Sequence, residues 1–283
     1  MKKMKTLNCA GKSLTFDRTL VMGVLNITPD SFYESSRYQS LDQVLSSAEQ
    51  MVRDGVDILD VGGESTRPGA DGTVTSEQEL ERVVPVVEAL RTNFDQVVSV
   101  DTSSALVISE ASKAGAGMIN DVRALLRPGA LEAAAATDLP VVLMHSLVEQ
   151  TEPGFVPQYD DLVSEVNEYL LERVSACETA GITRDRLILD PGFGGGMFGK
   201  TPAHDLQLLK HLDRVLALNF PVLAGMSRKS FIGAVLNKPA EQRLSASLAV
   251  ATLAARAGAQ IIRVHDVAET VDAVRMVDAV RNA

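Results

Sequence analysis

Eight short apolar runs along the chain each end in a side chain that can do chemistry or bind a ligand. The runs, rich in Val, Ile and Leu, are Leu20–Ile27, Val56–Val61, Val97–Val100, Met118–Asn120, Pro140–Met144, Leu187–Leu189, Pro221–Ala224 and Ile261–Val264. The polar residues at their ends are Asn26, Asp60, Asp101, Asn120, His145, Asp190, the segment 227–230, and Arg263 with His265. A purely structural sheet needs no such set, so the pattern predicts one site built from many strand ends.

These polar residues fall into two chemical groups. The hydrogen-bond acceptors are Asp101, Asn120 and Asp190, and they suit a planar heterocycle that presents N–H donors. The residues that carry or can carry positive charge are Arg67, Lys229, Arg263 and His265. On a chain of net charge −10 such a cluster indicates an anionic ligand group. The two groups together predict a substrate with a ring and a phosphate.

Each motif also has a plainer interpretation. Asp101 can be a helix N-cap, Asp190 can organise a turn before Pro-Gly, and the segment 227–229 can be a solvated helix start. A serine-hydrolase triad is set aside because no G-x-S-x-G elbow is present, and no zinc-ligand spacing occurs. The occurrence of polar residues on eight successive strand ends favours the site.

The elements that must position these residues alternate along the chain. Most apolar runs are continuous, as in parallel strands buried on both faces. Segments with helical spacing lie between them, at Leu41–Asp54, Ser76–Asn93, Ser104–Gly115, Asp160–Ala180, His204–Leu216, Glu241–Ala257 and Val267–Val280. Ser76 with Glu79 predicts a capping box at one helix start. We predict an α/β fold, a single (β/α)8 TIM barrel over residues 1–283 with 1–19 as an N-terminal lead-in. A doubly wound open sheet is the alternative.

Composition excludes several classes of protein. The chain has 283 residues, of which 46% are hydrophobic, so it is not disordered. Its acidic balance argues against a nucleic-acid partner. It has two cysteines, with Cys177 interpreted as core and Cys9 as a near-terminal bystander, and this usage fits a reducing cytoplasm. No apolar signal sequence and no run long enough for a membrane span is present.

The strand-end motifs closely resemble those of the dihydropteroate synthase family. The matching segments are VMGVLNITPDSF (21–32), DVGGESTRPGA (60–70), SVDTS (99–103), INDVR (119–123), LMH (143–145), LILDPGFG (187–194), GMSRKSFIG (225–233) and IIRVHDV (261–267). The resemblance runs from about residue 20 to 280, in order. It implies a transferase that joins 6-hydroxymethyl-7,8-dihydropterin pyrophosphate to p-aminobenzoate, giving 7,8-dihydropteroate and pyrophosphate.

The resemblance also implies roles for individual residues. The pterin would contact Asp101, Asn120, Val122, Met144, Asp190, Phe193 and Lys229. The pyrophosphate would contact Asn26, Thr66, Arg67, Arg263 and His265, with Asn26 also a ligand of Mg²⁺, the implied cofactor. The p-aminobenzoate site would comprise Phe32, Thr66, Pro68, Arg228, Lys229 and Ser230. The catalytic set would be Asn26, Asp101, Lys229, Arg263 and His265, and the family implies a homodimer packed through barrel helices.

The implied chemistry is physically consistent. Pyrophosphate leaves readily only when its charge is neutralised, which Mg²⁺ and the Arg/His cluster would do. Because an aryl amine is a weak nucleophile, we expect pyrophosphate to depart first and Asp101 to stabilise the resulting pterin cation. No dedicated base is needed, and His145 is not assigned as one. Two other functions stay open: a pterin-dependent methyltransferase barrel, which needs no pyrophosphate clamp, and a catalytically weakened pterin-binding partner protein.

The chain departs from the family pattern in three loops. Tyr33–Ser36 replaces a glycine-containing turn, and the stretch after His145 lacks the usual residues. After the sixth run, DPGFG continues into GGMFGKTP, about three residues longer than usual. Gly195 stands where an aromatic residue often covers the pterin, and we expect Phe198 to supply that ring from a different backbone position. Since sulfonamides compete for the neighbouring subsite in this family, we hypothesise reduced sulfonamide sensitivity.

Overall fold

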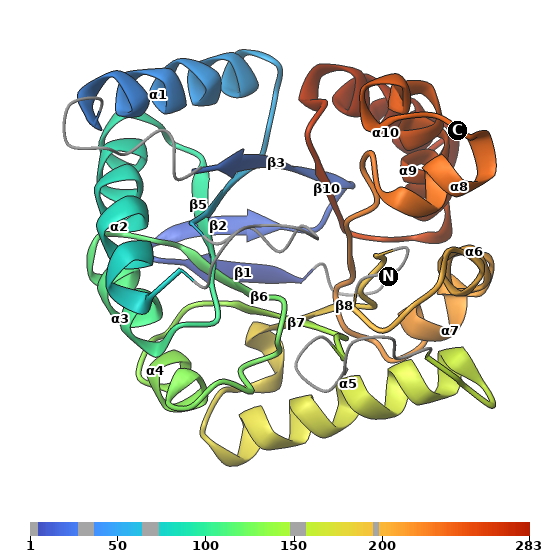
Figure 1. Ribbon diagram of the computed structural model, residues 1–283, viewed down its shortest axis with the longest axis horizontal. Helices are drawn as coiled ribbons and strands as arrows, with labels where there is room; N and C mark the ends of the chain where they lie inside the picture. The colour runs from blue at the N-terminus through green and yellow to red at the C-terminus, as the bar shows by residue number, and fades with distance from the viewer. Residues whose placement is uncertain (1–4, 28–36, 64–73, 148–156, 195–197) are drawn as a thin grey trace.

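Eight parallel strands form the centre of the molecule, with helices around them (Figure 1). The computed structural model describes residues 5–27, 37–63, 74–147, 157–194 and 198–283, with no side-chain detail for 37–40. The strands are β3 (Leu20–Asn26), β4 (Ile58–Gly62), β5 (Val97–Asp101), β6 (Met118–Asp121), β7 (Val141–Met144), β8 (Leu187–Asp190), β9 (Leu223–Ala224) and β10 (Ile261–Val264). Their order is β8-β7-β6-β5-β4-β3-β10-β9.

A parallel bridge between Leu189 and Val222 joins the two ends of this sheet, so the strands form a nearly closed barrel. The predicted (β/α)8 barrel is confirmed, and the open doubly wound sheet is wrong. Almost every strand residue is buried, because helices cover the outer face and side chains fill the interior. Figure 1 shows the helices as a ring around the strands.

The helices follow the strands in the order expected of βα units. They are α1 (Arg37–Arg53), α2 (Ser76–Asn93), α3 (Ala105–Lys113), α4 (Ala130–Ala135), α5 (Leu162–Thr179), α6 (Pro202–Lys210), α7 (Leu212–Leu216), α8 (Ser230–Leu236), α9 (Leu244–Ala257) and α10 (Val267–Arg281). The sequence pattern missed the short α4 and α8. The capping box at α2 lies one residue earlier than predicted: Thr75 accepts from the backbone of Gln78, whose side chain accepts from the Thr75 N–H.

The lead-in contains a hairpin that sequence reasoning did not foresee. Strands β1 (Thr6–Cys9) and β2 (Lys12–Thr15) pair antiparallel. Leu7, Cys9 and Leu14 point inward and pack against interior side chains of the barrel strands, such as Met22 and Met118. The interpretation of Cys9 as a bystander is wrong, since only 1% of it is exposed. The hairpin therefore closes the end of the barrel opposite the strand ends that carry the polar residues.

None of the described helices is both long enough and apolar enough to cross a membrane. That residues 1–283 form one single domain stays a prediction.

Candidate active site

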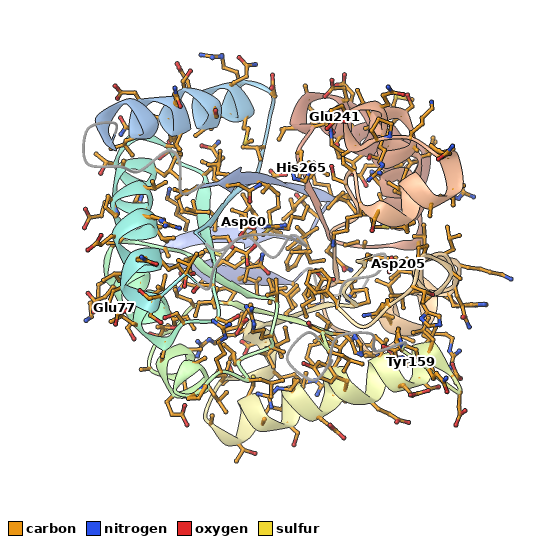
Figure 2. All side chains as sticks on the ribbon, viewed as in Figure 1. Asp60, Glu77, Tyr159, Asp205, Glu241 and His265 are labelled. Atoms are coloured by element: carbon orange, nitrogen blue, oxygen red, sulfur yellow. The ribbon has the colours of Figure 1, made fainter. Side chains whose placement is uncertain are left out.

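Arg263 lies at the centre of an ion-paired cluster at the carboxyl ends of the strands. Its Nε donates to Asp60 Oδ2 at 2.6 Å, and its second terminal nitrogen donates to Asp101 Oδ2 at 2.6 Å. Asn120 Nδ2 donates to the same Asp60 oxygen at 3.2 Å. Strands β4, β5, β6 and β10 each contribute one of these side chains, and Figure 2 places Asp60 near the centre of the barrel. Residues 203 positions apart in the chain thus share one hydrogen-bonded group.

Burial sets the electrostatics of this cluster. Burial raises the pKa of Asp101 well above its usual range. The positive charge of Arg263 lowers this pKa, and the negative charge of Asp60 raises it. For Arg263, burial works to lower the pKa, but the carboxylates of Asp60 and Asp101 outweigh it and keep the pKa raised. Arg263 is therefore always charged, whereas the Asp101 carboxyl is close to gaining a proton near neutral pH.

A second group forms around Asp190 and Lys229. Asp190 ends β8, and its Oδ1 accepts from the Gly192 N–H at 2.7 Å. Lys229 stands directly before α8 and donates from Nζ to the carbonyl of Phe193. Burial raises the pKa of Asp190, with Lys229 the main opposing charge. Burial also lowers the pKa of Lys229 to about 8, against the pull of Asp190. Asp190 and Lys229 therefore interact electrostatically, and Arg263 of the first cluster also acts on both.

The segment after β8 is held by side chains from other elements. Ser230 Oγ donates to the Gly194 carbonyl at 3.1 Å, and the Gly194 N–H donates to the buried carboxylate of Asp205 on α6. Phe198 is buried with φ +57°, and its ring centre lies 5.3 Å from Lys229 Nζ. This places an aromatic ring beside the predicted pterin-binding lysine, and the expectation that Phe198 covers the pterin stays a prediction.

Arg228 and His265 lie on the side of β9 and β10. The Arg228 guanidinium makes two hydrogen bonds to Asp266, at 2.5 and 2.8 Å. His265 Nδ1 lies 3.2 Å from Ser227 Oγ, and Figure 2 shows His265 beside the end of β10. The plainer interpretation of segment 227–229 as a solvated helix start is wrong for Ser227, which is buried.

Some of the remaining predicted site residues lie within the described part of the chain, and others lie outside it. Met144 is buried at the end of β7, Val122 is half-buried after β6, and Asn26 is exposed at the end of β3. The predictions for Phe32, Thr66, Arg67, Pro68 and Gly195 lie outside the described residues. Asp101 is not a helix N-cap, because Ser104 caps α3, whereas Asp190 does organise the turn before Gly192.

Comparison with known proteins identifies the family. A family model described as pterin binding enzyme matches residues 22–265. The dihydropteroate synthase of Escherichia coli strain K12 is 51% identical over 273 residues, which cover 96% of this chain and 95% of the relative. The chain belongs to the dihydropteroate synthase family of pterin-binding enzymes.

Solved structures of dihydropteroate synthases share the fold. The Xanthomonas albilineans enzyme with 4-aminobenzoic acid is 48% identical, with a TM-score of 0.90 over 99% of this chain and 100% of that one. The same enzyme in complex with 7,8-dihydropteroate is 45% identical, with a TM-score of 0.86 over 99% of each chain. The Yersinia pestis enzyme with a sulfonamide drug is 50% identical, with a TM-score of 0.89 over 98% and 99%.

The side chains at the strand ends of this dihydropteroate synthase family member could hold Mg²⁺ only if a bound phosphate group supplied further oxygen ligands. Among the described residues, no three His, Cys, Asp or Glu side chains gather where they could hold a metal. Asn26 offers one exposed amide oxygen at the strand ends. Mg²⁺ is typically bound by one or two protein oxygens plus substrate phosphates and waters, so an all-protein metal site does not fit here.

Sequence reasoning missed one residue of this region, Lys200. It is 1% exposed, and its Nζ lies 2.6 Å from His145 Nδ1. A lysine in a Gly-rich loop normally suggests a surface residue, and no sequence signal marks this one as buried.

Proposed function

We propose that this chain catalyses the condensation of 6-hydroxymethyl-7,8-dihydropterin pyrophosphate with p-aminobenzoate to give 7,8-dihydropteroate and pyrophosphate. One observation carries the proposal: Asp101, Asn120 and Arg263 form one bonded group, beside a second that contains Asp190 and Lys229. Acceptors for a pterin and cations for a pyrophosphate therefore share one end of the barrel. The relatives named for the same reaction support the proposal.

The pterin ring would lie between the two groups. Ionised Asp101 and Asp190 would accept from its N–H groups, and Lys229 and Asn120 would donate to its carbonyl or ring nitrogens. Phe198 would cover one face, since its ring already lies near Lys229. Val122, Met144 and Phe193 would supply apolar contacts.

The pyrophosphate would lie toward Asn26, Arg263 and His265, and the contacts to Thr66 and Arg67 stay predictions from the family resemblance. Bound Mg²⁺, held by Asn26 and the pyrophosphate, would neutralise part of the leaving group's charge. The carbon–oxygen bond between the pterin methylene and the pyrophosphate breaks, and the oxygen keeps the electron pair. Arg263 and His265 stabilise the charge that develops there.

The aryl amine of p-aminobenzoate then forms the new carbon–nitrogen bond. Asp101 stabilises positive charge on the pterin through the ring N–H groups. The attacked amine is a strong acid and gives its proton to water, so no base is required. His145 is a poor base here, because Lys200 occupies its Nδ1 and because burial holds the pKa of His145 far below its usual value. Phe32, Thr66, Pro68, Arg228 and Ser230, with Lys229, would frame the amine's subsite.

Pyrophosphate release from the dihydropterin pyrophosphate, with and without p-aminobenzoate in Mg²⁺, tests the proposed reaction. We expect release that depends on p-aminobenzoate and yields dihydropteroate. Pterin binding without product in either case would overturn the proposal in favour of a binding protein. A methyltransferase barrel would bind the pterin but show no Mg²⁺-dependent affinity for pyrophosphate.

Reduced sulfonamide sensitivity remains our hypothesis for the lengthened segment between Gly194 and Lys200. Phe198 from that segment lies beside Lys229, which supports an altered border of the p-aminobenzoate subsite. We expect a sulfonamide inhibition constant above the p-aminobenzoate Michaelis constant. A constant equal to or below it would contradict the hypothesis.

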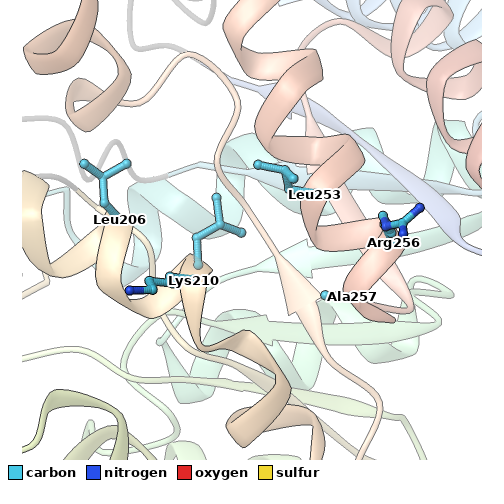
Figure 3. Close-up of a pocket in the computed structure, with 6 residues that line it drawn as sticks. Leu206, Lys210, Leu253, Arg256 and Ala257 are labelled. Carbon is cyan, nitrogen blue, oxygen red and sulfur yellow. The ribbon is translucent and has the colours of Figure 1, made fainter.

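We also propose that two copies of the chain associate through α6, α8, α9 and α10, in the cytoplasm. An apolar groove between α6 and α9 is lined by Leu206, Leu209, Lys210, Leu253, Arg256 and Ala257 (Figure 3). Leu206 is 44% exposed and Leu253 55%, and further exposed apolar side chains lie on α8 and α10. Apolar area of this kind is typical of a homodimer interface.

Sedimentation of Leu253→Asp tests this interface. We expect a dimer for the unchanged chain and a shift to monomer for the variant. Leu171→Asp, on α5 with 39% exposure, is the matched control and should stay dimeric. A monomeric unchanged chain would overturn the proposed dimer.

A further inference from the structure

Lys200 is a buried lysine, and within the part of the chain that the structure describes its side-chain hydrogen bonds go to His145. Its Nζ lies 2.6 Å from His145 Nδ1 and donates to the His145 carbonyl at 3.5 Å. When Lys200 is protonated it can only donate, so the His145 ring then accepts at Nδ1 and carries its proton on Nε2. Burying a charged lysine costs free energy unless other interactions compensate for it. The buried position of Lys200 therefore indicates a role in this region.

Lys200 joins the two chain segments that follow β7 and β8. The His145 N–H donates to the Asp190 carbonyl at 2.9 Å. Gly192, at φ +73°, packs so closely that a Cβ there would lie 2.1 Å from the His145 carbonyl oxygen and 3.3 Å from Lys200 Nζ. Lys200 therefore fixes the carbonyl against which the Asp190 turn rests.

The loop that carries Lys200 is itself anchored. The Tyr159 hydroxyl donates to the Gly199 carbonyl at 2.7 Å, and the Leu147 N–H donates to the Phe198 carbonyl at 3.4 Å. The Tyr159 ring in turn packs edge-on against His204 of α6. Lys200 is thus held from several elements and cannot swing out without breaking these contacts.

The charge of Lys200 acts on Asp190. The charged and titratable groups that face Lys200 are Asp190, Asp205, Lys229, His145 and His204. Those that face Asp190 are Lys229, Lys200 and Arg263. Burial raises the pKa of Asp190, and the positive charge of Lys200 counteracts this rise together with Lys229. Burial lowers the pKa of Lys200 itself to about 7, so its charge is most fully present below neutral pH.

We propose that Lys200 is a positioning residue for pterin binding, which holds the Asp190 turn in place through His145 and keeps the Asp190 carboxylate charged from inside the fold. The proposal rests on the proposed function, in which ionised Asp190 accepts from the pterin. Because Lys200 is buried, its proposed action is through Asp190 and His145.

The test is calorimetric binding of 6-hydroxymethylpterin to the full chain as a function of pH. Lys200→Met removes the charge with little change in length, and Lys200→Gln is a second uncharged variant that keeps a donor. The control is Lys113→Met, which removes an exposed lysine charge on α3. Thermal unfolding of each variant establishes that it is folded.

For both Lys200 variants we expect pterin affinity to fall about tenfold below neutral pH, where Lys200 carries its charge, and the acid limb of binding to move up by about one pH unit. The sign follows from the loss of a positive charge, which raises the pKa of Asp190 and leaves more of it protonated. A merely structural role would weaken binding equally at every pH. If the wild-type chain binds the pterin and both variants bind it with the same affinity and the same pH profile, the proposal for Lys200 is overturned. Failure of the wild-type chain to bind would instead refute the proposed function.

Discussion

The two ends of this barrel are built from the same strands but with opposite chemistry. At the carboxyl ends, Arg263 bridges Asp60 and Asp101, and neighbouring lysines have lowered pKa values. At the other end, Leu7, Cys9 and Leu14 of the hairpin pack on apolar strand residues. One end therefore buries charged side chains at a cost in free energy, whereas the other buries apolar side chains that stabilise the fold. Variants at the two ends should therefore affect different quantities.

The largest effect is expected for Arg263→Met at the polar end. The change leaves Asp60, whose side chain is 0% exposed, without its cation. Breaking a buried ion pair costs about 3–5 kcal/mol, so we expect lower thermal stability and a loss of kcat/KM above about a hundredfold. Enzyme assays and calorimetric unfolding measure both.

The matched control is Arg214→Met, which breaks an exposed ion pair with Asp161. Both partners are exposed and screened by water, so the variant's stability and kinetics should hardly change. Equal effects from Arg214 and Arg263 would refute the distinction between the buried cluster and the surface.

Lys229→Met should lower kcat/KM by about a hundredfold with little loss of stability, because it removes a buried charge without opening a cavity. The pH profile of the unchanged chain sharpens this prediction. Lys229, with a pKa lowered to about 8, loses its proton as pH rises, so activity should fall above about pH 8. Asp101 and Asp190 both have raised pKa values and gain protons as pH falls, and together they set the acid limb.

In the Lys229→Met variant the alkaline limb should disappear while the acid limb remains. Both limbs are read from kcat/KM for the pterin substrate across pH. Persistence of the alkaline limb at the same pH would show that another group causes it.

At the apolar end, Leu14→Ala should lower the free energy of unfolding by about 2–4 kcal/mol, through lost burial and a residual cavity. Leu14 is 6% exposed and lies far along the barrel from the charged cluster. We expect kcat and KM to stay within about twofold at a temperature where the variant is folded. A kinetic loss as large as that of Arg263→Met would break the comparison between the ends.

The smallest effect is expected for Cys9→Ala, which removes one buried sulfur and should cost about 1 kcal/mol. Burial raises the pKa of the Cys9 thiol to about 12, so it is an unreactive core group. Unchanged kinetics and slow reaction with thiol reagents in the folded chain are the expected observations. Rapid labelling of Cys9 would contradict its buried position on the inner face of the hairpin.

Some features of the protein were readable from the sequence because they depend on local pattern. Continuous apolar runs between helical segments predicted the barrel, since parallel strands buried on both faces require them. Polar residues such as Asp101, Asn120 and Asp190 were predicted at strand ends, which meet at one end of any such barrel. The roles given to these residues, and to those in the undescribed loops, stay predictions.

Other features depend on contacts between distant segments, and no local signal carries them. The hairpin was missed because its alternation spans only four residues per strand. The capping box was misplaced by one residue because Thr75 and Ser76 are both good caps. Lys200 looks like a loop lysine until the fold brings it to His145, 55 residues away.

The amino-acid sequence by itself determined the fold class and which residues stand at the strand ends, because burial periodicity and βα alternation are local properties. Only the tertiary structure decided how those residues pair: that Arg263 joins Asp60 with Asp101, that Phe198 lies by Lys229, and that Lys200 lies inside the fold. The physical reason is that pairing and desolvation depend on which strands become neighbours when the barrel closes.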